Sequence, residues 1–115
     1  MKFKVFHANV PNFGLGKPQK FPKEYTPVAV VEAVDVDDAF RLTNSIDQYW
    51  ANNREVEKLL ATHNFGWAHR PGLRSTSVGD VVVDAKGDIH RCAMAGWKRI
   101  GKVGDLPDGD QLLPQ

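Results

Sequence analysis

A β-hairpin is encoded by residues 79–94, which read GDVVVDAKGDIHRCAM. An apolar run of three valines, a polar turn and a second, mostly apolar run follow one another. Gly87 stands in the turn, where a residue that tolerates positive φ is needed. The pattern predicts two antiparallel strands, near residues 80–84 and 89–95. The chain from Gly96 to Ile100 either extends the second strand or follows it.

Two segments nearer the N-terminus also have strand patterns. Residues 2–8 alternate between the two faces of a half-buried strand. Residues 28–34 are β-branched and almost entirely apolar apart from Glu32, as expected of a central strand that is covered on both faces. Prolines and glycines recur through residues 9–27, so neither a helix nor a central strand can run through them. We expect a long loop there, packed in part on the body of the protein.

The middle of the chain has the period of a helix. Apolar side chains recur at intervals of three and four over residues 36–50, which predicts an amphipathic helix. The carboxylate of Asp35 or of Asp37 can accept hydrogen bonds from the free amides of its first turn. A shorter helix is expected over residues 54–61, and it needs packing against other elements to be stable.

Together these elements predict an α+β fold, a small and mostly antiparallel sheet with one main helix packed on one face and a C-terminal β-hairpin. Residues 62–76 are rich in Gly, Pro, His and Arg, and we expect an ordered loop anchored by Trp67. A chain of 115 residues corresponds to one domain. We place that domain in residues 1–104 and expect residues 105–115 to form a flexible acidic tail.

Composition excludes several classes of protein. The hydrophobic fraction of 42% and the charged fraction of 25% are those of a globular protein. No apolar run approaches the roughly 18 residues that span a membrane, and the N-terminus lacks a signal-peptide pattern. The net charge of +1 hides opposed segments, since residues 1–27 and 61–104 are basic whereas residues 28–60 and 105–115 are acidic. This distribution argues against a uniformly basic nucleic-acid coat and against an acidic DNA mimic.

Histidines and the single cysteine suggest a metal site or a catalytic pair. The candidate ligands His63, His69, His90 and Cys92 lack the paired spacing of structural zinc sites. A small enzyme that uses His69, His90 and Cys92 is a hypothesis that we rank below a protein-binding or nucleic-acid-binding role. No oxyanion loop surrounds the cysteine in the sequence. We therefore predict no catalytic residue, no metal ligand and no cofactor, and we interpret Cys92 as a small buried thiol in the hairpin.

A basic loop at residues 17–23, which contains Lys17, Lys20 and Lys23, suggests nucleic-acid binding. Its lysines could contact a phosphate backbone while a base stacks on Phe21. The alternative is a solvated loop that Phe21 pins to the body. Further cations that could join such a face are Arg70, Arg74, Arg91, Lys98 and Arg99.

The most specific string in the sequence is RSTSVGDV, residues 74–81. Ser77 and Asp80 can satisfy the backbone groups of a loop, while Val78 fills the core and Gly79 permits a tight entry into the strand. Arg74 could either lock this loop onto Asp80 or reach outward to a partner.

The same string, continued through Gly87, Cys92 and the sequence GWKRI at residues 96–100, resembles the YodL-like small domains. It also resembles the related polyvalent-protein-associated domains carried by phages, plasmids and other mobile elements of bacteria. The resemblance covers residues 74–100. Thr76 stands where a larger apolar residue is usual, and His90-Arg91 replaces a common aromatic pair. The family has no established activity, so the resemblance implies a genomic context and a hairpin.

From these observations we expect a non-catalytic accessory protein of a phage or mobile element, in the cytoplasm of the bacterial host. It would bind a host or phage macromolecule, of which a component of a defence system is one candidate. A protein partner is favoured, a nucleic-acid-binding module is the alternative, and no membrane is involved. The candidate binding residues are Lys17, Lys20, Phe21, Lys23, Trp67, Arg70, Arg74 and Arg91.

Overall fold

The computed structural model describes residues 1–10, 16–17, 19–44, 54–59 and 75–114. Within them the fold is α+β, as predicted, with a six-stranded antiparallel sheet in the order β3-β2-β1-β4-β5-β6. The strands are β1 (Lys2–Ala8), β2 (Tyr25–Glu32), β3 (Val56–Lys58), β4 (Val81–Val83), β5 (Asp88–Ala93) and β6 (Gly96–Lys102). The helices are α1 (Val36–Leu42) and the short 3-10 helices η2 (Val103–Asp105) and η3 (Gly109–Leu112).

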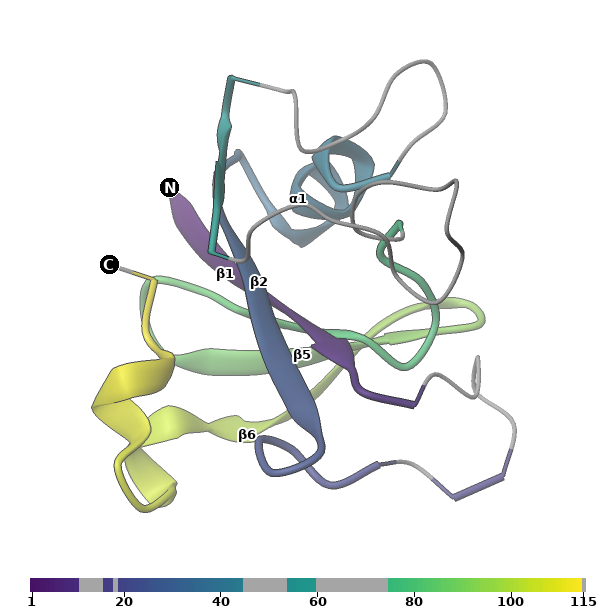
Figure 1. The fold of residues 1–115 in the computed structure, drawn as a ribbon, viewed down its shortest axis with the longest axis vertical. Helices are drawn as coiled ribbons and strands as arrows, with labels where there is room; N and C mark the ends of the chain where they lie inside the picture. The colour runs from purple at the N-terminus through teal and green to yellow at the C-terminus, as the bar shows by residue number, and fades with distance from the viewer. Residues whose placement is uncertain (11–15, 18, 45–53, 60–74, 115) are drawn as a thin grey trace, which may run out of the picture.

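The sheet is strongly twisted. In Figure 1, β2 runs steeply down the view while β5 and β6 run across it. The register shifts between Val5 and Phe6 and again between Ile89 and His90. Irregularities of this kind bend a strand and increase the local twist. The two halves of the sheet therefore present their side chains in different directions.

Alternate residues of the strands supply two separate apolar clusters. Val82 belongs to the cluster covered by α1, whereas its neighbours Val81 and Val83 belong to the cluster on the other face. This is the alternation of a pleated strand that is buried on both sides. The first cluster also contains Phe3, Val5, Val31, Ala39 and Leu42, and the second contains Phe6, Tyr25, Ile89 and Val103.

The predicted strands and hairpin are confirmed, with some shifted boundaries. The strand expected at residues 28–34 begins earlier, at Tyr25, and its four residues Val28–Val31 are all buried as predicted. The hairpin of β4 and β5 turns through Gly87, whose φ is +88°. The chain from Gly96 onward forms a strand of its own, β6, which pairs with β5.

The helix begins as predicted but is shorter. Asp35 caps it by accepting a hydrogen bond from the Asp38 amide (2.9 Å). The helix ends at Leu42, since the backbone of Thr43 leaves helical geometry with φ −107° and ψ 23°. The hydroxyl of Thr43 donates to the carbonyl of Ala39 (2.9 Å). The extension expected beyond residue 44 falls largely outside the described residues.

The prediction of a short helix over residues 54–61 is wrong. Val56–Lys58 instead form β3 and pair antiparallel with Ala29–Val31 of β2. The segment is too short for helix propensity to hold it alone, and the open edge of β2 offers backbone hydrogen bonds that an isolated turn cannot match.

The segment expected to be a frayed acidic tail packs on the body instead. Leu106, Leu112 and Leu113 lie against the second apolar cluster. Lys4 Nζ donates to the carbonyl of Gln111 (2.8 Å), which ties η3 to β1. Figure 1 shows these C-terminal turns in yellow at the lower left. Burial of the leucines outweighs the chain entropy that favours fraying.

In the part of the chain that the structure describes, no helix is long and apolar enough to cross a membrane.

Candidate functional site

The turn at residues 77–80 is held together by the carboxylate of Asp80, which is only 1% exposed. Its Oδ1 accepts a hydrogen bond from the Ala8 amide (2.9 Å), and its Oδ2 accepts one from the Ser77 amide (2.8 Å). Gly79 has φ +96°, so the turn into β4 requires a glycine at this position. Gly79 and Asp80 thus have the structural roles predicted for them. The Ser77 hydroxyl donates to the Asp80 carboxylate (3.5 Å), and the Ser77 amide is itself one of the backbone groups that Asp80 satisfies. Arg74, the proposed partner of Asp80, lies outside the described residues.

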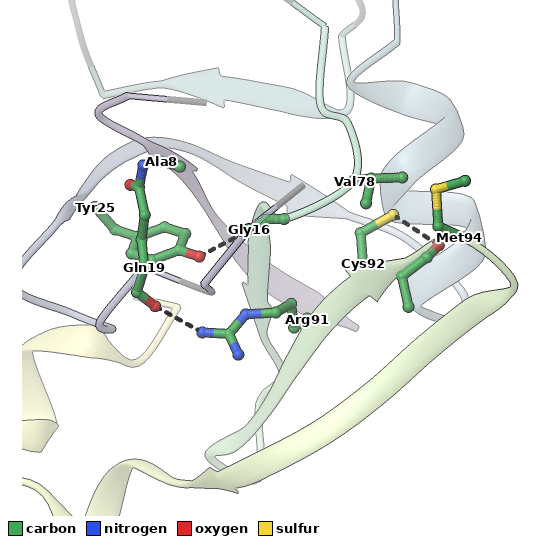
Figure 2. Close-up of a pocket in the computed structure, with 10 residues that line it drawn as sticks. Ala8, Gly16, Gln19, Tyr25, Val78, Arg91, Cys92 and Met94 are labelled. Atoms are coloured by element: carbon green, nitrogen blue, oxygen red, sulfur yellow. Dashed lines mark hydrogen bonds between the residues drawn. The ribbon is translucent and has the colours of Figure 1, made fainter. Parts of the chain in front are cut away.

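A cavity of about 200 Å³ lies beside this turn. Its walls come from the end of β1, from Gly16 and Gln19, from the start of β2, from Val78 and Gly79, and from the C-terminal end of β5 (Figure 2). Val78 is half-buried and faces this cavity, so the prediction that it fills the core is wrong. The turn places this side chain at the end of the sheet, outside both apolar clusters.

The polar part of the cavity wall is built by Gln19, Tyr25 and Arg91. The Tyr25 hydroxyl donates to the carbonyl of Gly79 (2.5 Å), and Arg91 Nη2 donates to the backbone carbonyl of Gln19 (2.9 Å). Figure 2 shows Arg91 reaching from β5 to Gln19. Two buried atoms, Arg91 Nε and Gln19 Oε1, have no hydrogen-bond partner among the described residues. Such unsatisfied groups are uncommon in folded proteins and call for an explanation.

Cys92 lines the same cavity, but its chemistry is that of a buried thiol. Burial, assisted by the negative charges of Asp80 and Asp37, raises the pKa of the Cys92 thiol to about 11. The thiolate is the nucleophile and the metal ligand, so this environment suppresses both kinds of reactivity. The Sγ atom lies 4.0 Å from the carbonyl oxygen of Ala93.

His90 is engaged elsewhere. Its Nε2 lies 3.0 Å from Oδ2 of Asp84, across the hairpin turn. Burial alone would raise the pKa of Asp84, but hydrogen bonds from His90 and from the amides of Asp88 and Lys86 outweigh it and hold that pKa below its usual value. Over the described ranges, no three His, Cys, Asp or Glu side chains gather as metal ligands. His63 and His69 lie outside those ranges.

The predicted binding residues are only partly brought together. Phe21 is half-buried, with its ring edge-on to Phe6 (4.9 Å between centroids) and to Tyr25 (5.4 Å). It therefore pins the loop to the second apolar cluster and is not free to stack on a base. Exposed lysines precede and follow it, and Gln19 connects this loop to Arg91. These lysines are Lys17, Lys20 and Lys23, whereas Trp67, Arg70 and Arg74 lie outside the described residues.

The basic strand β6 carries Lys98 and Arg99, which were predicted only as additions to a basic face centred on the N-terminal loop. It is the terminal strand of the sheet, and Arg91 of β5 lies directly opposite its Lys98. Trp97 anchors the strand, since its Nε1 donates to Asp37 (2.9 Å) and its ring contacts Phe40 edge-on (6.1 Å between centroids). The sequence signal for β6 is its lack of acidic residues, but that signal does not reveal that the strand lies at the edge of the sheet.

No family model, no curated protein and no solved structure matches the chain.

Proposed function

We propose that the protein is a non-catalytic binding module that captures an extended, acidic segment of a partner protein along β6. The proposal is carried by one observation, which is that β6 is a seven-residue edge strand whose charged side chains are all basic. An edge strand presents backbone amides and carbonyls that can pair with an added strand. Main-chain pairing supplies affinity in this mode, and side chains supply selectivity.

The charges on β6 favour an acidic partner. Lys98 and Lys102 are exposed and have no ion-pair partner in the described parts of the chain. Arg99 is exposed as well, and its Nε lies 3.0 Å from Asp88. Basic residues on an edge also discourage pairing between two copies of the same strand, since like charges would face each other. Carboxylates on an incoming segment would remove that repulsion.

The turn that precedes β6 adds an apolar contact. Met94 at its tip is 85% exposed, and its neighbours Ala93 and Ala95 are exposed too. A flexible thioether adapts to the surface it meets. A partner segment that follows β6 towards this turn would therefore pass from a cationic strand to an apolar tip.

The biological setting rests on the resemblance of residues 74–100 to domains of phages and mobile elements. It supports the role of an accessory protein that binds a host or phage macromolecule, and a component of a defence system fits that description. The raised pKa of the Cys92 thiol, about 11, favours a binding role over an enzyme that uses Cys92 as its nucleophile.

Selection from a display library of random peptides on the full chain tests the proposal. We expect enriched peptides that are rich in Asp and Glu and in strand-forming residues. The double substitution Lys98→Glu with Lys102→Glu should abolish their binding. A matched double substitution, Lys2→Glu with Arg54→Glu, makes the same change of charge near β3, at the opposite end of the sheet, and should retain it. Because Glu could disturb the fold, the neutral pair Lys98→Gln with Lys102→Gln serves as a second variant and should weaken binding at least about tenfold.

Other outcomes would overturn the proposal. Enriched peptides that lack acidic residues, or binding lost equally in both double variants, would remove β6 as the docking strand. Retention on heparin that falls steeply with salt, together with no enriched peptide, would favour the nucleic-acid alternative.

A further inference from the structure

Arg91 is a half-buried cation without a carboxylate. In the described part of the chain it forms no ion pair, and its one hydrogen bond joins Nη2 to the carbonyl of Gln19. Its Nε is buried and lacks an acceptor. A guanidinium removed from water is costly unless an anion compensates for it, and its planar fork matches a carboxylate. The side chain is therefore suited to an anion that comes from outside the described structure.

The rest of the cavity is apolar and small. Tyr25, Val78, Cys92 and Met94 contribute to its walls, and its volume of about 200 Å³ is below the range of typical small-molecule sites. A space of this order holds one aromatic ring or one branched aliphatic side chain. The ligand that fits it has one apolar group and a carboxylate close by.

The second unsatisfied atom narrows the class of ligand. Gln19 Oε1 is a buried acceptor that requires a donor, whereas Arg91 Nε is a donor that requires an acceptor. The C-terminal residue of a peptide carries an apolar side chain, a carboxylate and an amide N–H on adjacent atoms. Both atoms are covered in this structure, so the ligand reaches them when the Gln19 side chain, which donates to the carbonyl of Val10, turns to expose its own Oε1 and Arg91 Nε.

From this combination we infer that the cavity beside Arg91 binds the C-terminal residue of a peptide that ends in an aromatic or branched aliphatic side chain. Arg91 receives the carboxylate, Gln19 accepts the terminal amide N–H, and the side chain fills the space between Tyr25, Val78 and Met94. The inference deepens the proposed function and rests on it for the ligand being part of a protein. Lys98 lies opposite Arg91 in the register of β5 and β6, so it adds positive charge beside Arg91.

NMR titration of the full chain with three probes tests the site. The probes are N-acetylphenylalanine, its carboxamide and phenylacetate. We expect N-acetylphenylalanine to bind with a dissociation constant of about a millimolar, as is usual for so small a ligand, and to shift the Arg91 Nε–H resonance and the Gly79 amide. The carboxamide should bind at least about tenfold more weakly, because it lacks the charge that Arg91 pairs with.

Variants separate a specific site from general attraction to a cationic protein. Arg91→Gln should abolish the response, and Arg91→Lys, which retains the charge but lacks the fork, should weaken it. Arg41→Gln removes an exposed guanidinium from α1 and should leave the titration unaltered. The carboxylate site would be refuted by equal binding of the carboxamide or by no response of the Arg91 resonance. Equal binding of phenylacetate would refute the peptide C-terminus and assign the cavity to a free organic acid.

The two proposals fail separately. The titration contains no extended acidic segment, so it does not depend on β6. A positive titration combined with a failed peptide selection would refute the role of β6 alone. Selection of acidic peptides combined with a silent Arg91 resonance would refute the cavity alone.

Discussion

Removal of the Asp80 carboxylate should destabilise the whole protein. The carboxylate joins three parts of the chain, because it accepts hydrogen bonds from Ala8 at the end of β1 and from Ser77 in the turn while its own residue leads into β4. Asp80 is only 1% exposed, so water cannot easily replace its carboxylate as the acceptor of these hydrogen bonds. Asp80→Ala leaves both amides without this partner.

The magnitude follows from these two contacts. A hydrogen bond to a charged group contributes about 1.5–3 kcal/mol, so the loss of two should lower the free energy of unfolding by about 3–6 kcal/mol in Asp80→Ala. That is a large part of the roughly 5–15 kcal/mol that stabilises a domain. The melting temperature should fall by more than about 10 °C. Asp80→Asn retains one acceptor oxygen and places an NH₂ group against the other amide donor, and it should cost about half as much.

Urea unfolding followed by tryptophan fluorescence measures the effect. The control is Asp105→Ala, which removes an exposed carboxylate from η2 and should change the free energy of unfolding by less than about 0.5 kcal/mol. The opposing result is a decrease in the free energy of unfolding of less than about 1 kcal/mol for Asp80→Ala, with an unchanged slope of that free energy against urea concentration. That result would refute the assignment of Asp80 as the group that holds the turn.

Three further predictions concern other parts of the molecule. Gly109→Ala would place its Cβ 1.8 Å from the carbonyl oxygen of Val103, so the contact between η2 and η3 should open. The C-terminal segment should then become sensitive to protease. Protease resistance equal to that of the unmodified protein would contradict this prediction. Cys92 should react with a thiol reagent at neutral pH about 100-fold more slowly in the folded than in the urea-unfolded protein, given its raised pKa of about 11, and equal rates would show an accessible thiolate. Asp84 has a lowered pKa, so the stability that its ionised form contributes is present above the unfolded pKa and is lost as the pH falls through the folded pKa. The decrease in the free energy of unfolding caused by Asp84→Asn should therefore become smaller below about pH 4. A decrease that does not change with pH would contradict this linkage.

Local patterns of the sequence were sufficient for most of the strands. The valine run, the turn at Gly87 and the following apolar run predict the hairpin of β4 and β5, because the turn and the alternation are properties of adjacent residues. The Asp35 cap is local for the same reason. The role of Asp80 could also be predicted, since the amide it binds belongs to Ser77, three residues away in the same turn.

The remaining elements depend on contacts between distant residues. β3 forms because the edge of β2 is open to Val56–Lys58, and no helix propensity in residues 54–61 reveals that edge. The C-terminal leucines pack because the second apolar cluster leaves a surface for them. From composition alone, the segment that carries these leucines looks like a free tail.

The candidate site shows the same division. The sequence identifies Arg91 as a cation and residues 96–100 as a basic stretch, because charge is a property of the residues themselves. Only the tertiary structure makes β6 the edge of the sheet and brings Gln19, Tyr25, Val78 and Arg91 around one cavity. Whether a charge is paired, and whether a strand has an open side, depends on which distant segments lie beside it, and that is decided when the sheet assembles.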